Sequence, residues 1–175
     1  MIIKETQHLV GTSLHSKSKP VICNHDIGDE IDRNKYDGNL ASEYLRAKYF
    51  GLWVLVAEDN IIISRILLIL LKNIGFLVDV AKDGQEALDL AGGFKYSLII
   101  TDIDMPRMNG LEAMKAIRQL KDHATTPIVA CTSNSLSKYR TQFIDAGING
   151  YVKKPVVPRI LHLTLFDVLE NFFGH

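Results

Sequence analysis

Apolar residues along this chain fall in short runs that alternate with longer segments in which apolar residues recur at helical spacing. The short runs are rich in valine, isoleucine and leucine, and they predict strands at 52–57, 76–81, 96–101, 128–131 and 150–152. The longer segments predict helices at 60–74, 83–93, 109–120, 136–146 and 157–172. Because parallel neighbours need a crossover helix between them, this alternation predicts an α/β fold with a parallel sheet.

The first 50 residues have a different pattern. Residues 1–40 are polar, show no sustained period and carry several acidic residues amid glycine and asparagine, which is typical of a flexible lead or linker. Residues 41–50 predict one short helix. We therefore divide the chain into a flexible or partly helical extension, 1–50, and a folded domain, 51–175. The histidines of the extension have no second cluster of ligands around them, and we interpret them as solvated: His8, His15 and His25.

Polar side chains follow four of the predicted strands, at the point where each strand ends. Glu58 and Asp59 follow the first strand, Asp102 the third, Thr132 the fourth and Lys154 the fifth. The carboxyl ends of parallel strands share one edge of the sheet, so these side chains should converge there. The three carboxylates would repel one another unless a cation lies among them, and oxygen ligands favour Mg²⁺. An aspartate beside Mg²⁺, a lysine and a hydroxyl is equipped to accept a phosphoryl group.

Four segments carry a resemblance to a known family: VLVAEDN at 54–60, TDIDMPRMNG at 101–110, PIVACTS at 127–133 and YVKKP at 151–155. Together they resemble the receiver domain of response regulators, and they are closest in flavour to the receivers of hybrid histidine kinases. The resemblance runs from residue 52 to near 173. It implies a flavodoxin-like, doubly wound five-stranded parallel sheet, in the order 2-1-3-4-5, with five helices.

The resemblance also implies a role for each acidic residue at the sheet edge. Asp102 matches the aspartate that receives the phosphoryl group. Glu58 and Asp59 match the acidic pair that holds Mg²⁺, with Asp59 as the direct ligand. Asp104 stands where the family supplies a backbone carbonyl to the metal. The expected cofactor is therefore Mg²⁺.

The remaining motif residues match the parts that sense the phosphoryl group. Thr132 matches the switch hydroxyl, Tyr151 the switch aromatic, and Lys154 the lysine that binds phosphoryl oxygens, its bond to Pro155 usually being cis in the family. The resemblance implies a two-component signalling domain that takes its phosphoryl group from a histidine kinase or histidine phosphotransfer domain. It implies intrinsic phosphoryl-transfer and autodephosphorylation chemistry, but no independent enzyme.

Two other functions fit parts of the pattern. The sequence Thr101-Asp102-Ile103-Asp104 superficially fits the Asp-x-Asp motif of haloacid dehalogenase-type enzymes. In those enzymes, however, the second acidic pair follows the lysine, whereas Glu58 and Asp59 precede Asp102. A degenerate receiver that serves only as a binding module is the other alternative, and the full set of phosphorylation residues argues against it.

The helix predicted at 60–74 is apolar on more than one side. Its expected core face is Ile62, Ile66, Leu70 and Ile74, with Leu67 and Leu71 beside it. The opposite side carries Ile61, Leu68 and Ile69. An apolar stripe outside the core often marks a docking site, and histidine phosphotransfer domains dock near this helix in the family. Coverage of the stripe by the N-terminal extension is the alternative, and both stay open.

Composition narrows the setting. Lysine and arginine total 20, aspartate and glutamate total 20, and the net charge of +0 gives no general attraction to nucleic acid or anionic membrane. Cys23 and Cys131 give no disulfide framework. The apolar run 61–71 is shorter than the about 20 residues that a membrane span needs. We expect a cytoplasmic protein, and a homodimer that forms on phosphorylation stays open.

Overall fold

The sheet of the predicted α/β fold is present and has one strand more than expected. The computed structural model describes residues 23–24 and 38–174. Its parallel strands lie in the order β1-β6-β5-β4-β2-β3. Their bounds are β1 Cys23–Asn24, β2 Trp53–Ala57, β3 Leu77–Ala81, β4 Leu98–Thr101, β5 Ile128–Thr132 and β6 Gly150–Lys153. The five predicted strands and their 2-1-3-4-5 order are confirmed, and β1 adds a two-residue pairing along β6.

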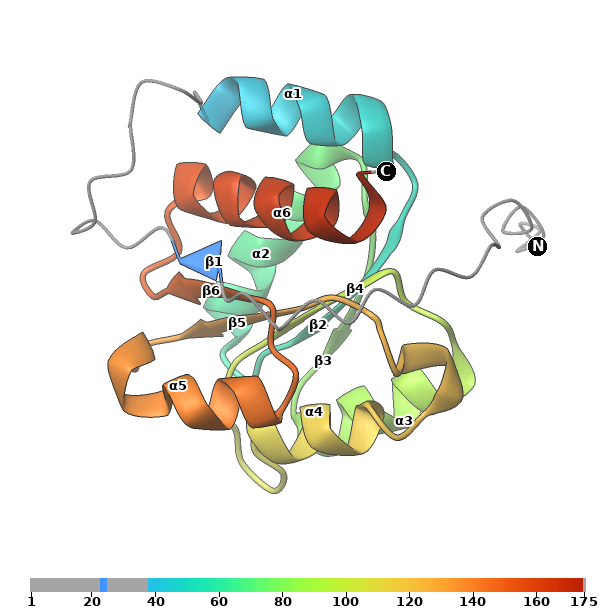
Figure 1. Ribbon diagram of the computed structural model, residues 1–175, viewed down its shortest axis with the longest axis vertical. Helices are drawn as coiled ribbons and strands as arrows, with labels where there is room; N and C mark the ends of the chain where they lie inside the picture. The colour runs from blue at the N-terminus through green and yellow to red at the C-terminus, as the bar shows by residue number, and fades with distance from the viewer. Residues whose placement is uncertain (1–22, 25–37, 175) are drawn as a thin grey trace.

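Helices cover both faces of this sheet. Their bounds are α1 Gly38–Tyr49, α2 Ile61–Ile74, α3 Gly84–Gly93, α4 Gly110–Ile117, α5 Leu136–Asp145 and α6 Pro158–Phe173. Figure 1 shows α1, α2 and α6 on one face and α3, α4 and α5 on the other. The five helices predicted after residue 51 are all present. The third ends earlier than expected, at Ile117, because a short 3₁₀ turn, Lys121–His123, follows it. In the described part of the chain, no helix is long and apolar enough to cross a membrane.

Two apolar cores separate the sheet from its helices. Alternate residues of each strand point to opposite faces, so Val54 and Val56 of β2 enter one core while Leu55 and Ala57 enter the other. All four residues of β4 and all five of β5 are buried. Strands covered on both faces read as continuous apolar runs, which is why the sequence predicted them.

Helix α1 belongs to the same core as the sheet. Its residues Ala41, Leu45 and Tyr49 are buried, and Leu45 and Tyr49 join the apolar cluster that contains α2 and α6. The helix lies along α6 (Figure 1). Lys48 Nζ lies 2.8 Å from Glu170 Oε1, and the Tyr49 hydroxyl donates to the same carboxylate at 2.5 Å. The short helix predicted at 41–50 is thus confirmed, and it begins earlier, at Gly38.

Helix α2 is turned differently from the prediction. Its buried residues are Ser64, Leu67, Leu71 and Ile74. Ile62 and Ile66, expected in the core, are 67% and 42% exposed, and that part of the prediction is wrong. The helix carries two apolar stripes of equal period on neighbouring sides, and helical periodicity alone does not tell which one faces the sheet.

The outer side of α2 remains apolar. Ile61 and Ile69 are 65% and 59% exposed, as expected, whereas Leu68 is half-buried. Among the described residues, α1 packs chiefly against α6 and only secondarily against α2. Four isoleucines of α2 are therefore exposed on the described surface: Ile61, Ile62, Ile66 and Ile69.

Candidate functional site

Asp102 lies directly after β4 and is buried, with 6% of its surface exposed. Its backbone N–H donates to the carbonyl of Ala57 at the end of β2, at 2.8 Å. Its side-chain Oδ1 accepts from the Ile103 N–H at 2.6 Å, and Oδ2 accepts from Lys154 Nζ at 2.6 Å. The Asp104 N–H also donates to Oδ1, at 3.4 Å, so the carboxylate is held by two main-chain donors and one cation.

The acidic pair follows β2, beside Asp102. Glu58 is 2% exposed, and its Oε1 accepts from the Asn60 N–H at 3.2 Å, while Asp59 is exposed. Burial raises the pKa of Glu58 above its ordinary value, and the neighbouring Lys154 only partly opposes this effect. Carboxylate oxygens of Glu58, Asp59 and Asp102 all lie within 4.8 Å of one another. The predicted convergence of these three residues is therefore what the structure has.

Lys154 lies between two of these carboxylates. Its Nζ is 2.6 Å from Asp102 Oδ2 and 2.7 Å from Glu58 Oε2, and its side chain is 9% exposed. Burial works to lower the pKa of Lys154, but the hydrogen bonds to Asp102 and Glu58 outweigh it and raise the pKa above its ordinary value. The Lys154–Pro155 peptide bond is cis, as the resemblance implied. The lysine is therefore charged at neutral pH and shared by two buried acids.

This donor set fits a hard divalent cation. Three carboxylates meet here, and a single lysine, although it contacts two of them, offsets only one of the three negative charges. Mg²⁺ takes oxygen ligands, keeps several waters and needs only one or two direct carboxylates. The exposed Asp59 leaves an open side to such a cluster. Receiver domains generally bind Mg²⁺ at an acidic site of this kind.

Thr132 and Tyr151 meet at a residue that the sequence analysis did not single out. Thr132 is fully buried at the end of β5, and its Oγ1 accepts from the Asn134 N–H at 3.3 Å. The buried Tyr151 donates its hydroxyl proton to the Asn134 carbonyl at 2.6 Å. The Asn134 side chain in turn donates to the Asp104 side chain. Asn134 therefore joins the loop after β5 to the loop after β4, and only its place after a strand could have indicated this.

The loop after β4 folds back on Asp102. Gly110 donates its N–H to the Ile103 carbonyl at 2.9 Å, and a Cβ at Gly110 would overlap the Asp102 carbonyl oxygen. Only glycine allows so close an approach. Asn109 and Glu112 form the capping box that starts α4. The residues between Asp102 and Gly110 thus form one closed loop at the site.

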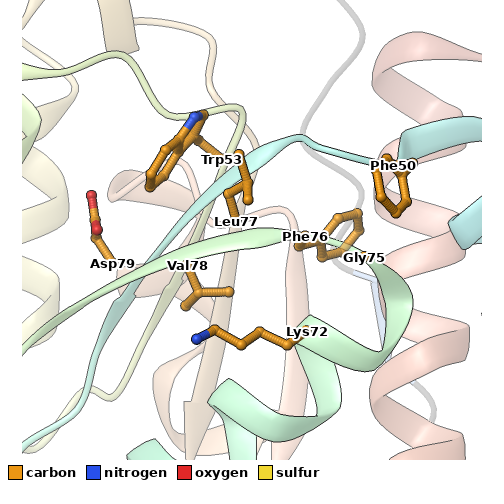
Figure 2. Close-up of a pocket in the computed structure, with 8 residues that line it drawn as sticks. All are labelled: Phe50, Trp53, Lys72, Gly75, Phe76, Leu77, Val78 and Asp79. Carbon is orange, nitrogen blue, oxygen red and sulfur yellow. The ribbon is translucent and has the colours of Figure 1, made fainter. Parts of the chain in front are cut away.

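A shallow pocket of about 480 Å³ lies at the other end of the sheet. Figure 2 shows the residues that line it: Phe50, Trp53, Lys72, Gly75, Phe76, Leu77, Val78 and Asp79. Trp53 and Leu77 begin β2 and β3, whereas Asp102 follows the end of β4. Asp79 accepts from the Tyr96 hydroxyl at 2.8 Å. None of the residues predicted for the phosphoryl site lines this pocket.

A doubly wound parallel sheet with an aspartate, two further acids and a lysine at its carboxyl edge is the arrangement that the resemblance to receiver domains implied. Residues 54–166 match the family described as the response regulator receiver domain, and the chain belongs to this family. The family is a signalling family of two-component and phosphorelay proteins. The resemblance seen in the sequence motifs is thereby confirmed.

Similar curated proteins are much longer than this chain. Hybrid signal transduction histidine kinase I of Dictyostelium discoideum is 38% identical over 116 residues, which cover 62% of this chain and 7% of that protein. Autoinducer 2 sensor kinase/phosphatase LuxQ of Vibrio parahaemolyticus is 37% identical over 123 residues, 70% of this chain and 14% of that protein. The similarity concerns the receiver segments of these kinases.

Solved structures share the fold. Chemotaxis protein CheY4 of Vibrio cholerae has a TM-score of 0.66 at 34% identity, covering 68% of this chain and 99% of that one. The receiver domain of sensor histidine kinase PA1611 from Pseudomonas aeruginosa, described with a magnesium ion coordinated in its active site cleft, has a TM-score of 0.62 at 29% identity. It covers 71% of this chain and 99% of that structure.

Proposed function

We propose that this chain receives a phosphoryl group on Asp102, with Mg²⁺ bound by the acidic cluster, from the phosphohistidine of a histidine kinase or a histidine phosphotransfer domain. The observation that carries the proposal is Lys154, which lies 2.6 Å from Asp102 and 2.7 Å from Glu58 in a cluster of three carboxylates. The magnesium ion described for the PA1611 receiver supports the cofactor, and the match to hybrid kinases supports the donor.

The transfer needs one bond to form and one to break. A carboxylate oxygen of Asp102 attacks phosphorus, the phosphorus–nitrogen bond to the donor histidine breaks, and the imidazole nitrogen leaves with the electron pair. A bound Mg²⁺ would neutralise charge on the phosphoryl oxygens. Lys154 would then exchange its contact with Asp102 for a phosphoryl oxygen, which keeps its positive charge beside the group being transferred. Glu58 and Asp59 would hold the metal, with Asp59 as the direct ligand and the Asp104 carbonyl completing the protein ligands.

The switch would pass through Thr132 and Tyr151. Thr132 Oγ1 accepts from the Asn134 N–H, and turning toward a phosphoryl oxygen would release that N–H. The Asn134 carbonyl is the acceptor of the Tyr151 hydroxyl, so a movement of this loop would be felt at Tyr151 directly. The same aspartyl phosphate would be hydrolysed by water with the help of the same groups, which supplies the intrinsic autodephosphorylation.

The partner would dock on α2. Its exposed isoleucines form an apolar stripe beside the loop that carries Glu58 and Asp59. Burial of aliphatic side chains contributes about 1.5–3 kcal/mol each before the costs of association. Ile69→Asp should weaken transfer from a phosphotransfer partner without changing labelling by acetyl phosphate, because Asp102 and the metal cluster are untouched. Light scattering of the chain with and without the phosphoryl group would show whether a homodimer forms on phosphorylation.

The direct test is labelling with a small phosphoryl donor. Acetyl phosphate with Mg²⁺ should add one phosphoryl group, detected by intact-protein mass spectrometry, and phosphoramidate should do the same because its phosphorus–nitrogen bond resembles phosphohistidine. Asp102→Asn should abolish the label, since an amide is no nucleophile here, and a chelator should abolish it too. The matched control is Asp122→Asn, an exposed aspartate away from the site. Persistent labelling of Asp102→Asn at another residue would end the proposal.

The same experiment separates the alternatives. A haloacid dehalogenase-type enzyme would turn over small phosphate esters, whereas a receiver should release phosphate only from its own aspartyl phosphate. A degenerate receiver would take up no label at all. The complete set of Glu58, Asp59, Asp102, Thr132 and Lys154 favours the phosphoacceptor.

A further inference from the structure

Arg107 adopts an unusual backbone conformation in the loop that follows Asp102. Its φ angle is 65°, and it is the one non-glycine residue with a positive φ in the described part of the chain. This left-handed conformation disfavours a side chain such as arginine, so surrounding contacts must support it. The residue stands five positions after Asp102 and three after Asp104, within the closed loop that ends at Gly110.

The side chain of Arg107 pairs with Asp83, a buried residue from another part of the chain. Asp83 is 1% exposed and lies at the start of α3. Its Oδ1 accepts from the Glu86 N–H at 2.9 Å and thereby caps that helix. Its Oδ2 forms the ion pair with the Arg107 guanidinium. One oxygen of this carboxylate therefore caps α3, and the other holds the loop after Asp102.

A backbone contact lies next to this ion pair. Gly84, the residue after Asp83, donates its N–H to the Met108 carbonyl at 3.1 Å. A Cβ at Gly84 would come within 2.5 Å of that oxygen, so the absence of a side chain allows the start of α3 and the loop to touch. Two consecutive residues of one segment therefore hold two consecutive residues of the other.

The opposite end of the loop is held as well. The Asp104 side chain accepts from the Asn134 side chain, in the loop after β5. Asp104 is thus attached to the loop after β5 through its own side chain, and three residues later Arg107 attaches the same loop to the start of α3. These two attachments can fix the position of the Asp104 carbonyl although neither of them is made to that carbonyl.

We infer that the Arg107–Asp83 ion pair is a positioning device that holds the loop after Asp102 in the conformation that binds Mg²⁺. The inference rests on the proposed function, because it concerns the metal site assigned there. In this role Arg107 would not itself bind the metal or the phosphoryl group. It acts through the backbone of the loop, and it uses a buried carboxylate that also fixes the start of α3.

The sign of one mutational effect separates this role from simple electrostatics. Removing a positive charge near a cation site should strengthen Mg²⁺ binding, because two like charges no longer repel. Removing a positioning contact should weaken it, as the loss of groups that orient metal ligands commonly does. Arg107→Ala therefore strengthens binding if charge alone matters and weakens it if the loop needs the ion pair.

The experiment is a Mg²⁺ titration followed by NMR of backbone amides, with four variants compared with the intact chain. Arg107→Ala and Arg107→Gly should both raise the dissociation constant of Mg²⁺ about tenfold. Glycine favours the left-handed conformation, so Arg107→Gly tests the side chain while leaving the backbone at ease. Arg107→Lys keeps a charge that can reach Asp83 and should restore most of the affinity. Lys82→Ala removes an exposed positive charge next to Asp83 and should not weaken binding.

The metal-free spectra provide a second readout. The amides of Asp104 and Glu86 should shift or broaden in Arg107→Gly before any Mg²⁺ is added, because the ion pair links the two segments. If the intact chain binds Mg²⁺ and Arg107→Gly binds it as tightly or more tightly, the positioning role is overturned while the proposed function stands. Weak binding by Arg107→Ala together with normal binding by Arg107→Gly would also overturn the positioning role, since backbone conformation would then be the cause. An intact chain that neither binds Mg²⁺ nor takes up label would overturn the proposed function as well.

Discussion

Two cationic side chains, Lys154 and Arg118, are partly buried at opposite ends of this sheet, and their hydrogen-bond partners differ. Lys154 follows β6 and lies between the carboxylates of Asp102 and Glu58. Arg118 follows α4 and donates to the carbonyls of His123 at 2.9 Å, of Gly147 at 2.6 Å and of Thr126. Burial lowers the pKa of Arg118 to about 10, whereas the neighbouring carboxylates keep the pKa of Lys154 raised.

The difference lies in what the partners can do. Backbone carbonyls do not titrate and cannot leave, so Arg118 holds together the segments that enter β5 and β6. Carboxylates can bind a metal or a phosphoryl group in place of the lysine, so the contacts of Lys154 are exchangeable. The contacts of Arg118 with carbonyls thus suit a structural role, and the contacts of Lys154 with carboxylates suit a site that binds a metal ion or a phosphoryl group.

Arg118→Met should have the largest effect on stability. The variant leaves three carbonyl oxygens without their guanidinium donor, which should lower the free energy of unfolding by about 2–4 kcal/mol. Mg²⁺ affinity of the folded protein should not change. Urea unfolding measures the first quantity and a Mg²⁺ titration the second. Arg140→Met, at an exposed position of α5, is the control and should change the free energy by less than about 0.5 kcal/mol. Equal stability of the two variants would show that the Arg118 contacts with the three carbonyls do not stabilise the fold.

Lys154→Met should reverse the pattern. Without Mg²⁺, the loss of the shared cation leaves Asp102 and Glu58 facing each other, and the free energy of unfolding should fall by about 2 kcal/mol. Saturating Mg²⁺ should restore most of this stability, because the metal replaces the missing charge. Acetyl phosphate labelling should still be about a hundredfold slower than in the intact chain, since no group replaces the lysine at the phosphoryl oxygen. Lys153→Met, the exposed neighbour, should behave as the intact chain. Unfolding that ignores Mg²⁺ would contradict this prediction.

Glu58 should make the stability of the fold, and its stabilisation by Mg²⁺, depend on pH. Its pKa is raised in the folded chain above the ordinary value of 4.5, so the folded state binds its proton more tightly than the unfolded state. Without metal, stability should therefore increase as the pH falls from neutral toward that value. Mg²⁺ competes with the same proton, so the stabilisation by Mg²⁺ should shrink over the same range. Thermal unfolding at several pH values, with and without Mg²⁺, measures both slopes. Glu58→Gln should flatten them, and unchanged slopes in that variant would assign the effect to another group.

Lys48 is expected to show the smallest effect. It pairs with Glu170 across α1 and α6, but the contact lies at the surface, where water screens charges and side-chain ordering offsets the gain. Lys48→Met should leave the melting temperature, Mg²⁺ affinity and labelling unchanged within error. A clear loss of stability would contradict the expectation that an ion pair at the surface contributes little to the stability of this fold.

Much of this arrangement could be predicted from the sequence, because it rests on local patterns. Strand ends bring Glu58, Asp102 and Lys154 to one edge wherever the sheet is parallel. The contacts that were missed join segments far apart in the chain. No period or spacing indicates that Arg107 would reach Asp83, or that Asn134 would link Thr132, Tyr151 and Asp104.

The two other misses have similar causes. The side of α2 that faces the core was predicted wrongly, because Ile62 and Ile66 make as regular a stripe as Leu67 and Leu71. The pairing of β1 with β6 involves two residues of a polar segment, and so short a strand gives no alternation to read. The boundary at residue 51 stays a prediction.

The packing of α1 on α6 has a consequence for how the chain is made. Lys48 and Glu170 are separated by 122 positions, so α1 leaves the ribosome long before its partner exists. At about 5–20 residues per second, the apolar side of α1 would wait roughly 6–24 s for α6. Contacts between such distant segments also slow folding, because a long loop must close before they form. Helix α1 is therefore the first helix of the described fold to be synthesised, and its burial is completed only when α6 has emerged.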